Sequence, residues 1–161
     1  MIEHRYTDMR IRGTRRLADF DGCQLNEPLA MHVRSDRADE FRTSLRVADL
    51  RSLDVVAMEA TTCRIDRAPS LVAESDPEVC AFVLPINGGV VLHQEGREAQ
   101  LNPDQIGLYS SSTPFRMDIV SYSSQTHLLR VQLPKARLAL PDHAVDGLAA
   151  VPISSTASAR C

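Results

Sequence analysis

The chain has 161 residues and a net charge of −3, and 43% of its residues are hydrophobic, 24% charged and only 4% aromatic. These values predict one globular domain with an aliphatic core, and the net negative charge argues against a free-standing DNA-binding protein because it does not attract phosphates. No apolar stretch approaches the ~20 residues that cross a bilayer, and the N-terminus lacks the apolar region of a secretory signal, so we expect a cytoplasmic protein without membrane contact.

Residues 1–40 mix charged and apolar side chains without clear periodicity and are expected to form an N-terminal arm. Four arginines between positions 10 and 16 make the start of this arm basic. The arm is either a solvated, partly ordered segment or one that folds over a ligand or touches DNA phosphates. Ser35 could cap a short helix running through Glu40, since its side-chain oxygen can accept a hydrogen bond from a free backbone N–H.

A β-rich segment follows over residues 41–134. Its apolar runs are separated by turn sequences such as Asn87-Gly88-Gly89 and Asn102-Pro103-Asp104, in which glycine allows positive φ and proline stops a ladder. The predicted strands cover about residues 41–47, 53–64, 79–86, 90–94, 98–101, 106–110, 115–120 and 126–133. Short strands at this spacing, without a long helix between them, predict a mainly β protein with a closed or double-sheet architecture, most simply a jelly roll.

Alternation of apolar residues assigns one face of these strands to the core. The residues predicted to point inward are Val90, Leu92, Ile106, Leu108, Phe115, Met117, Ile119, Leu129, Val131 and Leu133. The strand over residues 79–86 is apolar at both parities, so it is predicted to be covered on both faces, by the arm or by an element missing from the chain.

Residues 135–161 are rich in Ala, Ser and Pro and are expected to form a short helical or linker segment. Residues 135–140 predict one helical turn that Pro141 ends. Asp146-Gly147-Leu148 predicts a turn.

The sequence predicts no catalytic residue, metal ligand or cofactor. Metal-dependent enzymes of the small β-barrel class hold iron, manganese or nickel with several histidines and one carboxylate, whereas the hairpin around His93 supplies a single histidine. His93 is expected to be a solvent-facing hairpin residue. The four cysteines lie far apart without a C-x-x-C pair, which favours buried or incidental thiols over disulfides or a zinc site. They are Cys23, Cys63, Cys80 and Cys161.

Several short phrases stand in a specific order and spacing between about residues 41 and 153. They are Cys63-Arg64 with Arg67, Ser75-Asp76-Pro77, Gln94-Glu95-Gly96-Arg97-Glu98-Ala99, Leu101-Asn102-Pro103-Asp104, Leu108-Tyr109, Thr113-Pro114-Phe115 and Leu128-Leu129-Arg130-Val131-Gln132-Leu133-Pro134. With these phrases the chain resembles the N-terminal effector-binding domain of transcription regulators of the AraC/XylS family. The resemblance implies a cupin-like double-stranded β-barrel over residues 41–134 that binds a small organic effector.

In that family the barrel is joined to two helix-turn-helix units, often through a linker helix that also dimerises. The resemblance ends near Ser155, where such a linker would begin. It therefore implies the ligand-sensing part of a regulator that is not an enzyme, could form a homodimer and meets DNA only through a module absent from this chain. Two alternatives stay open: a small metal-dependent cupin enzyme, such as an isomerase or dioxygenase, and a stand-alone dimerising inhibitor.

The resemblance also supports a ligand pocket inside the barrel, and a core with few aromatic side chains has less volume to fill that space. Arg64 or Arg130 could meet a carboxylate on the ligand, and His127 is expected to line the pocket as a polar group. The candidate ligand-binding residues are Met58, Arg64, Phe82, Leu92, Leu108, Met117, His127 and Leu129.

Overall fold

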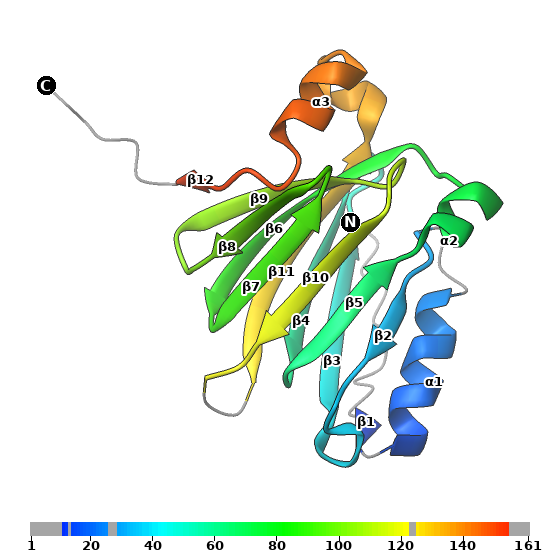
Figure 1. Ribbon diagram of the computed structural model, residues 1–161, viewed down its shortest axis with the longest axis vertical. Helices are drawn as coiled ribbons and strands as arrows, with labels where there is room; N and C mark the ends of the chain where they lie inside the picture. Colours follow the sequence, from blue (N-terminus) through cyan, green and yellow to red (C-terminus); the bar gives the residue numbers. More distant parts are fainter. Residues whose placement is uncertain (1–10, 13, 26–28, 123–124, 155–161) are drawn as a thin grey trace, which may run out of the picture.

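The computed structural model describes residues 11–12, 14–25, 29–122 and 125–154. Two antiparallel sheets face each other and enclose the core (Figure 1). The larger sheet has the order β1 (Ile11–Arg12), β3 (Arg42–Asp49), β4 (Asp54–Ala60), β11 (Thr126–Pro134), β6 (Val79–Asn87), β9 (Gln105–Ser110) and β12 (Ile153–Ser154). The smaller sheet has the order β2 (His32–Arg34), β5 (Cys63–Arg67), β10 (Phe115–Val120), β7 (Gly89–Gln94) and β8 (Arg97–Leu101). The predicted mainly β, cupin-like jelly roll is confirmed, as a two-sheet sandwich rather than a closed barrel.

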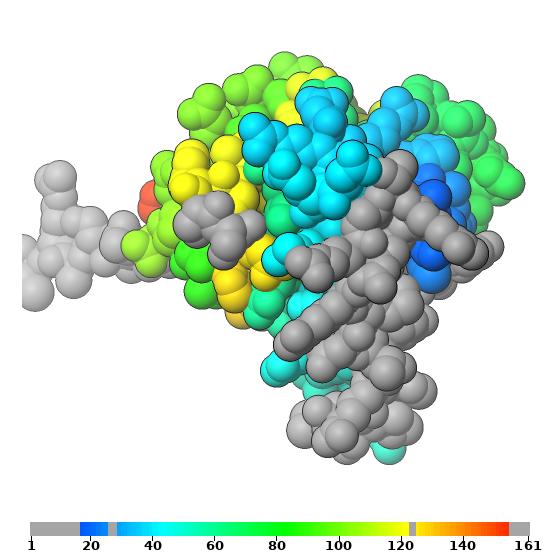
Figure 2. Space-filling view, turned by 90° about the horizontal axis from the view of Figure 1, so that it is seen from below, coloured from blue at the N-terminus to red at the C-terminus, as the bar shows by residue number. Residues whose placement is uncertain are grey.

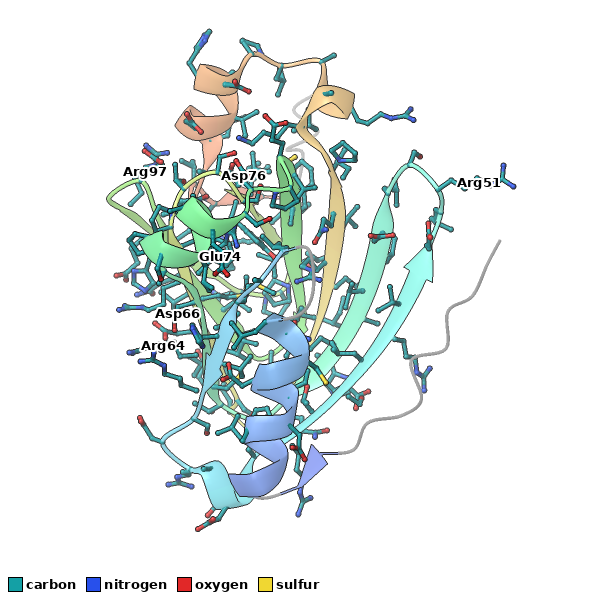
Figure 3. The ribbon with its side chains drawn as sticks, turned by 90° about the vertical axis from the view of Figure 1, so that its right-hand side faces the viewer. Arg51, Arg64, Asp66, Glu74, Asp76 and Arg97 are labelled. Carbon is teal, nitrogen blue, oxygen red and sulfur yellow. The ribbon has the colours of Figure 1, made fainter. Side chains whose placement is uncertain are left out.

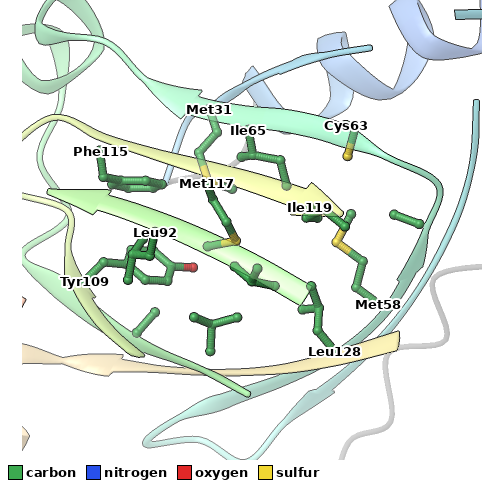
Figure 4. Close-up of a cluster of buried hydrophobic side chains, with 14 of the residues drawn as sticks. Met31, Met58, Cys63, Ile65, Leu92, Tyr109, Phe115, Met117, Ile119 and Leu128 are labelled. Atoms are coloured by element: carbon green, nitrogen blue, oxygen red, sulfur yellow. The ribbon is translucent and has the colours of Figure 1, made fainter. Parts of the chain in front are cut away.

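The main core lies between the sheets and is largely aliphatic, as the composition predicts. Its best buried members include Phe41, Ala60, Val83, Leu92 and Ile119, which are 0% exposed. Figure 4 shows the centre of this cluster, where Met58 and Met117 approach from opposite sheets. Methionine fills irregular gaps between aliphatic side chains, so it suits a core that contains few rings.

Most strand ends lie where the turn residues of the sequence predicted them. The six strands from β6 to β11 match the predicted ranges to within one residue at each end. The predicted strand over residues 53–64 is wrong, because β4 ends at Ala60 and the chain bends at Thr61 and Thr62 before Cys63 begins β5 in the opposite sheet. Because of this crossover, the predicted single strand contributes β4 to the larger sheet and β5 to the smaller sheet.

The N-terminal segment was predicted to be an arm, and its described residues form a helix and two short strands that pack on the sandwich. Helix α1 (Thr14–Leu25) packs along β2 (Figure 3), and Phe20 is 2% exposed with its ring 5.9 Å from that of Phe41. The β2 strand pairs with β5 and therefore belongs to the smaller sheet. The helix predicted from Ser35 is reduced to a short 3₁₀ turn, η1 (Ala38–Glu40), although the Ser35 hydroxyl does accept a hydrogen bond from the Arg37 N–H at 3.2 Å.

The C-terminal segment covers the outer face of the larger sheet. After β11 come η2 (Lys135–Leu138), which matches the predicted helical turn, and α3 (Asp142–Leu148). The turn predicted at Asp146-Gly147-Leu148 is wrong, since these residues end α3. Val145 of α3 is fully buried in a second apolar cluster with Cys80 and Leu108. The strand that is apolar on both faces, β6, is thus covered on its outer face by this segment.

The predicted faces are right for two strands and wrong for two others. In β7 and β10 the expected residues point into the core, among them Leu92 and Met117. In β9 the core side is occupied by Gly107 and Tyr109, so Ile106 and Leu108 face outward. In β11 the buried residues are Thr126 and Leu128, so Leu129, Val131 and Leu133 lie on the outer face of the sheet. No helix among the described residues is long and apolar enough to cross a membrane.

Candidate functional site

One end of the sandwich carries an open cleft lined by polar and charged side chains. The cleft lies between the segment from β2 to the start of β3, the β4–β5 bend and the end of β10. In Figure 2, which looks at this end, the cyan segment around η1 stands beside the yellow ends of β10 and β11. Its lining includes four arginines and five carboxylates, namely Arg34, Arg37, Arg42, Arg64, Asp36, Asp39, Glu40, Glu59 and Asp118.

Arg64 belongs to this cleft and is already paired. Its Nε lies 2.9 Å from Oδ1 of Asp118. Burial alone would raise the pKa of Asp118, but the hydrogen bond from Arg64 and the charges of Arg116 and Arg64 outweigh it and hold this pKa below its usual range. Arg64 therefore holds a carboxylate of the protein, and a ligand would have to displace Asp118 to reach it.

Cys63 forms part of the cleft wall and is 3% exposed. Burial, helped by the negative charge of Asp118, raises the pKa of its thiol to about 12. A thiol in this state is not a nucleophile at neutral pH. The expectation of a buried, unreactive thiol is confirmed for Cys63 by this environment, whereas Cys161 lies outside the described residues.

His93 lies within a ladder of charges on the outer face of the smaller sheet. Its Nε2 is 3.3 Å from Oδ2 of Asp118, its Nδ1 is 3.5 Å from Oε2 of Glu98, and the guanidinium of Arg116 is 3.0 Å from Nε2. The ladder crosses β8, β7 and β10 at one register level. Cross-strand pairs of opposite charge stabilise a sheet, so His93 has a structural role on this surface.

The structure separates the predicted ligand-binding residues into four places. Met58, Leu92 and Met117 meet in the main core. Leu108 lies in the second cluster with Phe82 packed against it, under α3. Arg64 lines the cleft. The last two, His127 and Leu129, point away from the core: the imidazole lies 3.3 Å from the carboxylate of Glu59, and Leu129 is half-buried on the outer face.

Two polar side chains that face the core are absent from the list of candidate ligand-binding residues, although Arg130 was considered as a partner for a ligand carboxylate. Arg130 shares the parity of Leu128 on β11 and lies opposite Val56 and Val83, which are both buried. Tyr109 on β9 is 1% exposed, and its hydroxyl points toward the middle of the main core (Figure 4). The signal that could have identified them is their parity, once the strand faces are assigned correctly.

No group of three or more His, Cys, Asp and Glu side chains is placed to hold a metal ion in the part of the chain that the structure describes. The arrangement offers instead a polar cleft at one end and an interior in which one arginine and one tyrosine face aliphatic side chains.

A model of the AraC-binding-like domain family matches residues 24–156, nearly the whole of the described sandwich. The chain belongs to this family. None of the curated proteins matches the chain. Among solved structures, the AraC-like transcriptional activator CuxR is similar with a TM-score of 0.63 and 20% sequence identity, over 76% of this chain and 44% of that chain. The chain thus spans less than half the length of CuxR, and the likeness shows the fold.

A second solved structure resembles this chain less closely. It is the cupin domain of an XRE-family transcriptional regulator from Enterobacter cloacae, with a TM-score of 0.44 and 16% identity over 56% of this chain and 95% of that chain. The family match supports a regulatory ligand-binding domain.

Proposed function

We propose that this chain is the ligand-sensing domain of a cytoplasmic transcription regulator, that a small organic effector binds between its two sheets, and that DNA is bound by a module outside the chain. The family match over residues 24–156 carries this proposal. The net charge of −3 supports the proposal that a separate module binds DNA, because an acidic domain does not attract the DNA backbone. A homodimer is part of the proposal.

The C-terminal segment offers a route by which binding could be transmitted. Arg97 of β8 donates hydrogen bonds to the carbonyl of Ala149 at 2.8 Å and to that of Asp146. The N–H of Ala150 donates to the carbonyl of Leu108 on β9 at 2.9 Å. A shift of β8 and β9 around a ligand would therefore move the end of α3. The effector would act by binding one arrangement of this segment better than another, which shifts the population between them.

Thermal unfolding of the purified chain against a panel of organic acids, amines, sugars and aromatic compounds tests the binding step. An effector at 100 times its Kd stabilises the folded state by about 2.7 kcal/mol, which is easily measured as a rise in Tm. The same compounds are then added to cells in which the full chain is fused to a heterologous DNA-binding domain that controls a reporter.

The proposal predicts that a compound that raises Tm also changes reporter expression, and that the change needs the fused chain. A compound that binds stoichiometrically and leaves the reporter unchanged contradicts a sensing role. Stoichiometric iron, manganese or nickel in the chain purified without chelators would contradict it too and would favour a cupin enzyme. Sedimentation at several protein concentrations measures whether the chain dimerises.

A further inference from the structure

Strand β3 lies next to the end of the larger sheet, and only the beginning of its outer side is paired. In the part of the chain that the structure describes, β1 pairs with Arg42 and Thr43, and no strand pairs with the outer side of residues 44–49. On its other side β3 pairs with β4 as far as Asp49. We call the outer side of residues 44–49 the open edge. Such an edge can bind another extended segment, because it presents unpaired backbone N–H and C=O groups.

The residues whose backbone groups point to the open edge follow from a hydrogen bond on the other side of the strand. The carbonyl of Arg42 accepts a hydrogen bond at 2.9 Å from the N–H of Thr61, at the end of β4. Successive residues of a strand direct their backbone groups to opposite sides, so the even-numbered residues of β3 face β4. The N–H and C=O groups of Leu45, Val47 and Asp49 therefore point to the open edge.

The register of β1 defines which residues could pair there. β1 runs antiparallel to β3, with Ile11 opposite Thr43 and Arg12 opposite Arg42. Residues 1–10 precede β1 and lie outside the described residues. The same register, continued toward the N-terminus, sets residue 9 opposite Leu45, residue 7 opposite Val47 and residue 5 opposite Asp49. Residues 5–10 thus have the length of the open edge.

The residues of this segment that share the parity of Ile11 suit the core side of the sheet. In the continued register Met9 would lie opposite Leu45, which packs against the main core. Thr7 would lie opposite Val47, which is half-buried. Threonine favours strands because it is β-branched, and methionine fills irregular gaps between aliphatic side chains.

The charges of the segment match those of β3. Asp8 would lie opposite Arg46, which is exposed and forms no ion pair with another residue that the structure describes. Arg5 would lie opposite Asp49. Directly opposed unlike charges stabilise a sheet and like charges destabilise it. A slip of two residues in one direction would set Arg10 opposite Arg46, so the register that β1 already has is also the one that pairs unlike charges.

We propose that residues 5–10 continue β1 as a strand along the open edge of β3, and that the N-terminal segment thereby completes the larger sheet. The proposal rests on the register of β1, on the length of the open edge and on the match of charges. This part of the predicted arm is then held in the sheet, where it neither covers a ligand nor contacts DNA phosphates. The proposal holds whether or not the chain senses an effector.

Amide hydrogen exchange, measured by NMR, tests the pairing residue by residue. The N–H groups of Leu45 and Val47 should exchange at least about tenfold faster in a variant that lacks residues 2–9 than in the full chain, because they lose their hydrogen-bond partners. The N–H groups of Ser44 and Arg46 point to β4 and are the internal control. Their exchange should change by less than about threefold.

Two proline substitutions test the same pairing in the full-length chain. In the proposed strand the N–H of residue 7 points to β3 and that of residue 6 points away. Proline has no N–H and is tolerated in an edge strand only where that group would face solvent. Thr7→Pro should therefore speed exchange at Val47 by at least about tenfold, and Tyr6→Pro by less than about threefold.

An engineered disulfide tests the register and the identity of the segment. Asp8 and Arg46 would form a pair that exchanges no backbone hydrogen bonds, with Cα atoms about 4.5 Å apart, which a disulfide can span. In a chain with Cys23 and Cys161 replaced by serine, Asp8→Cys combined with Arg46→Cys should oxidise to a disulfide within one molecule. The control, Asp8→Cys combined with Ala48→Cys, should form one at least about tenfold more slowly, because diagonal neighbours lie about 7–8 Å apart.

Several results would overturn the proposal. Unchanged exchange at Leu45 and Val47 in the shortened chain, equal effects of the two proline substitutions, or equal rates of the two disulfides would each do so. A disulfide that joins two molecules would show that the segment of a second copy occupies the open edge, and this also contradicts the proposal. The proline and disulfide variants keep residues 2–9, so they test the pairing even if the deletion impairs folding.

Discussion

Replacement of Arg67 by methionine should be among the most destabilising single substitutions in this domain. The side chain is 1% exposed and donates to the carbonyls of Ser111 and Ala30, each at 3.0 Å, and to that of Ser75. These carbonyls belong to the β9–β10 loop, the segment before β2 and the end of α2 (Pro69–Glu74). One guanidinium therefore joins three connections at the same end of the sandwich.

The expected loss follows from what the substitution leaves behind. Each carbonyl that loses its donor while buried costs about 1–3 kcal/mol. Part of that cost is returned, because burial disfavours the charge of Arg67 and lowers its pKa, with only Asp76 opposing the shift. The net loss is about 3–5 kcal/mol, a large share of the about 5–15 kcal/mol that stabilises a typical domain.

Urea unfolding followed by circular dichroism measures this loss, with Arg64→Met as the matched control. Arg64 lies three residues earlier on the same strand, but its side chain is 53% exposed and pairs with one carboxylate, so its loss should destabilise the fold far less than the loss of Arg67. Arg67→Lys should fall between the two, since an ammonium keeps the charge without the planar fork. If Arg67→Met loses less than about 1 kcal/mol, or no more than Arg64→Met, the argument from three shared carbonyls is refuted.

Three further predictions concern packing, pH and thiol chemistry. Gly107→Ala should lose about 1–3 kcal/mol of unfolding free energy in urea, because a Cβ there would lie 2.6 Å from a leucine methyl group. The control is Gly147→Ala, whose Cβ would meet nothing within 4 Å and which should be neutral or slightly stabilising. Equal losses in the two variants would contradict the packing argument for Gly107. The pKa of Asp118 in the folded state lies below its ordinary value of 3.8, so Asp118 contributes to stability above pH 3.8, and this contribution is lost as the pH falls through the folded pKa. The free energy of unfolding of Asp118→Asn should therefore fall less steeply at acid pH than that of the wild type. If the two curves of unfolding free energy against pH run parallel, this role of Asp118 is contradicted. Peptide mapping after treatment with iodoacetamide at neutral pH should find Cys23 modified before Cys63. Cys23 is exposed, whereas Cys63 is buried and the pKa of its thiol is about 12. Modification of Cys63 before Cys23 would be incompatible with the described core.

The strand boundaries could be predicted where the sequence carries strong turn residues. Gly96 adopts positive φ in the β7–β8 hairpin, at +70°, and Gly88 does so at +75° where the chain passes from β6 to β7 in the other sheet. A Cβ on Gly88 would lie 2.4 Å from the Thr126 hydroxyl. Such positions tolerate few other residues, so they are visible in the sequence. The bend at Thr61 and Thr62 has no glycine or proline, and β-branched residues favour strands. The sequence therefore predicted one long strand where there are two.

Helix α1 could not be predicted because its stability comes from packing. Half of its residues are polar or charged, and it has no acidic residue in its first turn and no basic residue in its last. Its helical state depends on Phe20, which packs against Phe41, and on Asp21, whose carboxylate accepts a hydrogen bond from the N–H of Val33 at 2.7 Å. Short helices in water depend on such tertiary contacts rather than on propensity.

The face of β11 was predicted wrongly for a reason that also hid the inward orientation of Arg130. This strand has apolar residues at both parities, because Leu128 faces the main core while Leu133 packs against the second cluster near α3. Alternation can choose a face only when one side of the strand is polar, and an error of one residue turns every side chain of the strand to the other side. With Leu129 taken as inward, Arg130 falls on the solvent side, where an arginine needs no explanation. With Leu128 inward, the same arginine lies between two buried valines of the neighbouring strands. The parity of a single leucine therefore decides whether this arginine is counted as a surface residue or as a core-facing one.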